Sequence, residues 1–195
     1  MFTWKKLNLP VVPDVFLTQA RDIAEQNADT SDTYIDVGAG YRNRVLHHQG
    51  RNVVSRCQIA QDMGKEWQQW VKENIVDSWL ETGVRINNDN GSDLHGPHTD
   101  PPVEKYKLYY LVESGGDDVH TCWYQEKGAE LTRAPGTVVV DYAKVEKIDD
   151  TVIPTGQWIL FNTNVLHGIE GAKKQRINLT ITLPPDHDFL SKYLT

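Results

Sequence analysis

The sequence predicts a mainly β protein with N-terminal helices, and two observations lead to that prediction. Before Gly83, two segments carry apolar residues at helical spacing, the clearer one running from Ile59 to Leu80. After Gly83, short apolar runs alternate with turn signals such as Gly115-Gly116 and Pro135-Gly136. We therefore expect an antiparallel β-sandwich or barrel, with the helices covering one outer face.

The composition is that of one globular, soluble domain. The chain has 195 residues, of which 39% are hydrophobic and 24% are charged, which is enough to bury a core. The net charge of −7 argues against a broad phosphate-binding surface, so nucleic acid is not an expected partner. Two cysteines without paired spacing indicate a reducing compartment. We see no signal peptide and no run of transmembrane length, so we expect a cytoplasmic protein without a membrane partner. The oligomeric state stays open.

Residues 1–83 are expected to form a helical support region. The first 13 residues hold two prolines and predict an extended arm or a first strand. Asp14 can cap a helix that continues to Gln26. A second helix is predicted from Ile59 to Leu80, with Gly83 as its stop. The basic loop 40–56 between the helices is either a solvated loop or a substrate lip.

Residues 84–183 are expected to form the β core, followed by a tail over 184–195. The predicted strands cover Val84–Asn88, Lys105–Val112, Val119–Tyr124, Gly136–Tyr142, Gln157–Phe161 and Ile177–Leu183. On the last strand Arg176 and Asn178 share one face, and apolar residues share the other. If helices cover the apolar face, Arg176 points into a cavity, where a buried cation requires an anion. The alternative is a strand whose polar face meets water.

A His-x-Asp motif, His98-Thr99-Asp100, begins the β core. Residues two apart on a strand project to the same face. An imidazole and a carboxylate so placed can form two corners of a 2-His-1-carboxylate triad, which suits non-haem Fe(II). The alternative is a polar loop that begins a strand. His167 and Arg176 lie further along, and we expect a hairpin to bring them to neighbouring positions.

In order and spacing, His98-x-Asp100, the distal His167 and Arg176 resemble the motif of 2-oxoglutarate- and Fe(II)-dependent dioxygenases. The nearest likeness is the prolyl hydroxylase-like branch with bacterial and viral members. The segments 161–168 and 108–111, the latter followed by a Gly-Gly turn, also resemble that branch. The resemblance covers roughly residues 84–183. It implies a double-stranded β-helix, a cupin-like jelly roll.

The resemblance also implies a set of site residues. Fe(II) would be bound by His98, Asp100 and His167, which form the catalytic centre. The cosubstrate 2-oxoglutarate would meet Arg176 through its distal carboxylate, with Tyr110 as a hydroxyl donor. Asn178 stands where the family often has Ser or Thr, and its amide can still donate a hydrogen bond to the cosubstrate. The reaction would consume O₂, release succinate and CO₂, and hydroxylate a peptidyl or free amino-acid substrate.

Two other classes of protein fit the same residues. One is a cupin-like metal enzyme that does not use 2-oxoglutarate, and the other is a non-catalytic β-sandwich binding module. His95 is a competing metal ligand or a residue behind the first ligands. Asn88 is a candidate for the cavity wall. Substrate specificity is expected to lie in the loops 40–56 and 143–156.

Overall fold

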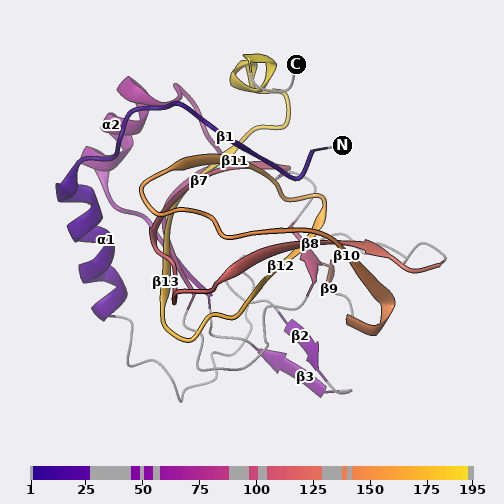
Figure 1. Cartoon of the computed structure of the whole chain (residues 1–195). Coiled ribbons are helices and arrows are strands. Elements are labelled where there is room, and N and C mark those ends of the chain that lie inside the picture. Colours follow the sequence, from indigo (N-terminus) through magenta and orange to yellow (C-terminus); the bar gives the residue numbers. More distant parts are fainter. Residues whose placement is uncertain are drawn as a thin grey trace.

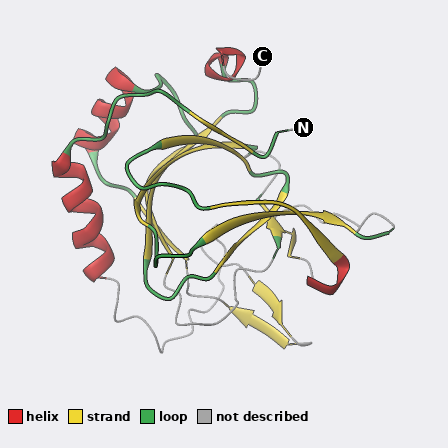
Figure 2. Cartoon of the chain, viewed as in Figure 1, coloured by secondary structure: helices red, strands yellow, loops and turns green. Residues whose placement is uncertain are grey.

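A computed structural model shows a mainly β protein with two antiparallel sheets and two α-helices (Figures 1 and 2). This confirms the predicted class. In Figure 1 the helices lie together on one side of the β layers, at the left of the view. The described residues are 2–26, 45–48, 51–54, 58–87, 97–100, 105–128, 138–139 and 142–192.

The larger sheet has six strands, each antiparallel to its neighbours. Its order is β1 (Trp4–Lys6), β11 (Trp158–Asn162), β7 (Tyr106–Glu113), β13 (Arg176–Leu183), β5 (Glu81–Asn87) and β4 (Gln58–Gln61).

The second sheet has five antiparallel strands. Its order is β10 (Val145–Thr151), β8 (His120–Glu126), β12 (Leu166–Glu170), β6 (His98–Thr99) and β9 (Val138–Val139). A separate hairpin pairs β2 (Val45–His48) with β3 (Arg51–Val54).

The helices α1 (Asp14–Gln26) and α2 (Lys65–Asn74) cover the outer face of the six-stranded sheet. The Phe16 ring meets the Trp67 ring edge-on at 5.4 Å between centroids. The Trp67 indole N–H donates to Thr82 Oγ1 at 2.9 Å and so attaches α2 to β5. The apolar residues of β13 pack beneath the helices, which leaves its other face for the interior between the sheets. The predicted division of this strand into two faces is confirmed.

The second helix is shorter than predicted, because β4 takes its first residues. Apolar spacing predicted a helix from Ile59, but Gln58–Gln61 pair with β5 instead, and Gly64 with φ of 87° precedes α2. Pairing with a neighbouring strand outweighed the local helical periodicity. Gly83 is not a helix stop. It lies within β5, where an added Cβ would stand 2.2 Å from the carbonyl oxygen of Gln61. The close approach of β4 therefore requires glycine at this position.

Two further segments differ from the predictions. The region 143–156, expected to be a loop, forms most of β10, which pairs with β8. The predicted tail is docked, since Phe189 and Leu190 on a 3-10 helix, Asp188–Lys192, are buried in the main core. None of the helices in the described part of the chain combines the length and the hydrophobicity that a membrane crossing demands.

Candidate metal centre

A cavity lies between the two sheets, and its wall comes from the inward faces of both. It encloses about 620 Å³ of empty space, part of which is continuous with solvent. Strand alternation sends every second residue inward, so β7 contributes Tyr109 and Leu111 while Leu108 and Tyr110 face the helices. The polar residues of the wall are Arg85, Asn87, His98, Asp100, Tyr109, Thr121, His167, Arg176 and Asn178.

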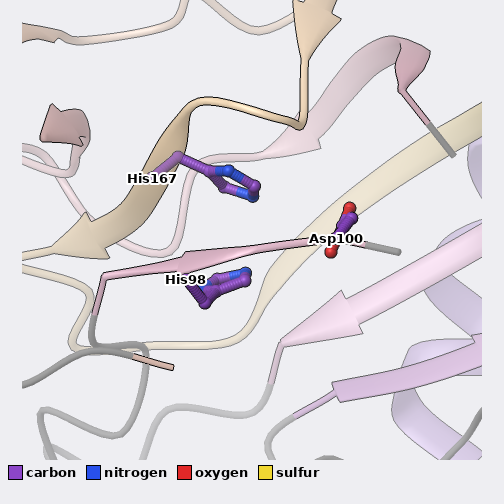
Figure 3. A group of neighbouring side chains, drawn as sticks. All are labelled: His98, Asp100 and His167. Carbon is purple, nitrogen blue, oxygen red and sulfur yellow. The ribbon is translucent and has the colours of Figure 1, made fainter. Parts of the chain in front are cut away.

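The three predicted metal ligands come together in this cavity. His98 lies on β6 and pairs in register with His167 on β12, while Asp100 directly follows β6. One donor atom from each residue lies within 4.8 Å of the others, and the imidazole centroids are 4.4 Å apart. All three side chains are buried, and Figure 3 shows the two rings and the carboxylate around a common space. This group could hold a metal ion.

Hydrogen bonding defines the orientation of His167. Its Nδ1 lies 2.9 Å from the carbonyl oxygen of Val165. A carbonyl oxygen only accepts, so Nδ1 carries the proton and Nε2 keeps the lone pair that a metal needs. Such an outer contact fixes both the tautomer and the angle of a ligating imidazole.

Asp100 is held by a buried lysine from the opposite sheet. Lys107 on β7 donates from Nζ to Asp100 Oδ2 at 2.6 Å, and the two side chains are 0% and 1% exposed. The backbone N–H of Asp100 also donates to the carbonyl oxygen of Thr163 at 3.1 Å. The ion pair joins the two sheets and fixes the plane of the carboxylate. A ligand oxygen held in this way needs little reorganisation when a metal binds.

Arg176 is a buried cation held by neutral groups. It is 4% exposed, and its guanidinium donates to the carbonyl oxygen of Ser114 at 3.3 Å and to Thr121 Oγ1 at 3.2 Å. Among the described residues, no carboxylate forms an ion pair with it. Burial lowers the pKa of Arg176 to about 10, an effect that Tyr109 partly opposes. A carboxylate entering the cavity would stabilise this cation.

Two expectations about the cosubstrate residues divide. Asn178 lines the cavity as expected of a contact residue. Tyr110 does not, and its assignment is corrected. Its ring packs among the helix-facing residues at 5.2 Å from the Trp158 ring, where burial raises the pKa of its hydroxyl. The tyrosine of β7 that reaches the cavity is Tyr109, because neighbouring residues on a strand face opposite ways.

The predicted hairpin between His167 and Arg176 is wrong. His167 lies inside β12 of the five-stranded sheet, and Arg176 begins β13 of the six-stranded sheet. β12 pairs with β6 and β8, whereas β13 pairs with β5 and β7. The chain crosses from one sheet to the other between these residues. They nevertheless share the cavity, because each sheet turns the relevant face inward.

Some predictions fall outside the described residues, namely those for His95, Asn88 and the side chains of the loop 40–56. From the region 143–156, Ile153 lines the cavity.

Sequence reasoning missed Lys107, Thr121, Tyr109, Arg85 and Asn87. Their signal is a polar residue at every second position of a strand that is otherwise apolar, as in β5 and β7.

Comparison of the chain with models of known protein families and with curated proteins finds no match. Fold and site alone therefore define its class. It is a mainly β protein of two antiparallel sheets that enclose a buried His-Asp-His group with the donor set of a metal centre.

Proposed function

We propose that the chain is a non-haem Fe(II) dioxygenase that uses 2-oxoglutarate and O₂, hydroxylates its substrate, and releases succinate and CO₂. One observation carries the proposal. The buried group of His98, Asp100 and His167 shares a single cavity with Arg176, a buried cation bonded to neutral acceptors.

The donor set fits Fe(II). Two imidazoles and one carboxylate provide the facial triad that this ion takes in oxygenases, with other positions open to substrate and O₂. His167 Nε2 and the Asp100 carboxylate are held by contacts with Val165 and Lys107. When bound, the ion would supply the redox chemistry that couples decarboxylation of the 2-oxo acid to hydroxylation. The protein's part is to hold three ligands on one side of it.

Arg176 provides the second half of the proposed cosubstrate site. A guanidinium binds a carboxylate through two parallel, charge-assisted hydrogen bonds. The contacts with Ser114 and Thr121 hold its plane in advance, so little side-chain entropy is lost on binding. Apolar side chains between the ligand groups exclude water and strengthen this attraction; they are Leu111, Ile159, Phe161 and Ile169.

The strand order supports a double-stranded β-helix for this chain. From β5 to β8 successive strands alternate between the six-stranded and the five-stranded sheet, and from β10 to β13 they alternate again. Alternation of this kind winds the chain around the space between two sheets, as in a jelly roll. It also accounts for the arrival of His98, His167 and Arg176 in one cavity from distant parts of the sequence.

The test is anaerobic addition of Fe(II) and 2-oxoglutarate to the metal-free protein. We expect the weak visible charge-transfer band of the chelate. The band should vanish in His98→Ala and require far more 2-oxoglutarate in Arg176→Gln. Arg21→Gln is the matched control, because it removes an exposed arginine with the same change in charge. Admission of O₂ should then yield succinate.

Other outcomes would point to the rival classes. Metal binding without a 2-oxoglutarate band would indicate a cupin-like enzyme that does not use this cosubstrate. A folded protein that binds no Fe(II) would indicate a binding module. Either result would overturn the proposal.

A further inference from the structure

A second arginine faces the cavity beside Arg176. On the paired strands β5 and β13, Arg85 stands opposite Asn178, and Asn87 stands opposite Arg176. All four side chains line the cavity and are at most 7% exposed as residues. They form one polar face, here called the Arg/Asn face, with the two arginines on one diagonal and the two asparagines on the other.

The charges of the cavity favour a further anion. Among the described residues of its wall, Asp100 is the one carboxylate, and Lys107 is bonded to it. A divalent ion and the dianionic 2-oxo acid would balance each other. Both guanidiniums of the Arg/Asn face would then remain in excess.

The contact of Arg85 with Glu81 does not remove this excess. Arg85 Nη2 lies 3.1 Å from Glu81 Oε2, but the Glu81 side chain is 47% exposed, so water weakens the pair. This contact holds one edge of the guanidinium and orients the group.

Asn87 gives an independent indication that the face receives a ligand. Its Oδ1 is buried and has no hydrogen-bond partner among the described residues. A buried amide left unsatisfied is costly, and a native protein keeps one where something else satisfies it. The amide lies at the cavity wall next to Arg176 in register, and a rotated amide offers N–H donors to a carboxylate.

We propose that the Arg85 half of the Arg/Asn face binds the carboxylate of the primary substrate, a small free acid with an apolar body. This rests on the proposed function, which assigns Arg176 to the 2-oxo acid. Arg85 is then the group that determines substrate specificity, with Asn178 beside it. The apolar body would meet Ile153, Ile159 and Ile169 of the same wall.

The size of the cavity favours a small acid over a peptide segment. Cavities of about 300–1,000 Å³ hold single small ligands. The cavity here has about 620 Å³, which must also receive the 2-oxo acid. An internal peptide segment would bring no carboxylate of its own to Arg85.

The test measures carboxylate recognition without knowledge of the natural substrate. Protein loaded with Mn(II) and saturating 2-oxoglutarate is titrated calorimetrically with hexanoate and with hexanamide, which has the same body without the charge. We expect hexanoate to bind at least about tenfold tighter. Arg85→Gln should remove this preference, and Arg85→Lys, which keeps the charge but loses the planar fork, should retain part of it. Arg21→Gln should keep the full preference.

A second titration separates the two arginines. We expect Arg85→Gln to weaken hexanoate binding at least about tenfold more than 2-oxoglutarate binding, and Arg176→Gln, loaded with Mn(II) alone, to show the reverse. Equal affinity for hexanoate and hexanamide would overturn the inference, as would equal loss of both acids in Arg85→Gln. Tighter binding of acetyl-Ala-Ala-Leu than of hexanoate would assign the site to a peptide terminus instead. Failure of the wild-type protein to bind 2-oxoglutarate would contradict the proposed function, whichever result hexanoate gives.

Discussion

Replacement of Lys107 by methionine tests how the candidate metal centre is built. The substitution keeps an unbranched side chain of similar length but removes the ammonium that donates to Asp100 at 2.6 Å. Because both side chains are essentially inaccessible to water, the carboxylate would lose its charged partner without gaining solvent. We therefore expect Lys107→Met to destabilise the metal-free protein severely.

The magnitude follows from the burial of the pair. Removal of one partner of a buried ion pair costs about 3–5 kcal/mol, against a total stability of about 5–15 kcal/mol for a domain. For a chain of this length each kcal/mol moves Tm by about 2–4 °C, so the expected loss is about 6–20 °C. The double variant Lys107→Met/Asp100→Asn removes both charges. It should be less destabilised than the sum of the single variants, by about 1–3 kcal/mol.

The assay is urea and thermal unfolding of the metal-free protein, with and without added Mn(II). Lys65→Met is the control, because Lys65 is exposed at the start of α2 and its loss should change stability by less than about 0.5 kcal/mol. A divalent ion can replace the lost ammonium beside Asp100. Mn(II) should therefore raise Tm more in Lys107→Met than in the wild type. If Lys107→Met unfolds like Lys65→Met, the ion pair does not support the site and this reasoning is wrong.

Three further predictions concern the centre and the packing around it. His167→Ala should abolish succinate formation while the far-UV circular dichroism stays native, and full turnover would exclude His167 as a ligand. Trp67→Phe removes the indole donor to Thr82 and should cost about 0.5–1.5 kcal/mol in urea unfolding, whereas an unchanged midpoint would mean that this bond contributes nothing. Burial raises the pKa of the Cys122 thiol and leaves it inaccessible, so in a Cys57→Ser background iodoacetamide at pH 8 should label native protein far more slowly than unfolded protein. Equal labelling rates would show that Cys122 is exposed.

The sequence predicted those features that depend on chemistry within one strand. His98 and Asp100 are two residues apart, so their common side follows from the alternation of a strand alone. The same alternation on β13 placed Arg176 and Asn178 on the cavity face and the apolar residues beneath the helices. In each case a short run of residues contained the whole argument.

Features that depend on the partner of a strand could not be predicted in this way. The apolar spacing from Ile59 is compatible with a helix, and only the pairing of β4 with β5 decides against it. Lys107 carries a charge inside an apolar strand, which is visible in the sequence. Its partner Asp100 belongs to the other sheet, and strand alternation gives no information across that gap.

Tyr109 and Tyr110 show how narrow the margin is. Both are tyrosines on one strand, and a shift of one residue exchanges the cavity face for the helix face. Lys107 settles the choice, because its bond to Asp100 fixes the odd-numbered residues of β7 toward the interior. A charged residue inside an apolar strand therefore identifies the inward face whenever the sheets enclose a polar site. Applied to β5, the same argument places Arg85 and Asn87 in the cavity, which is where the structure has them.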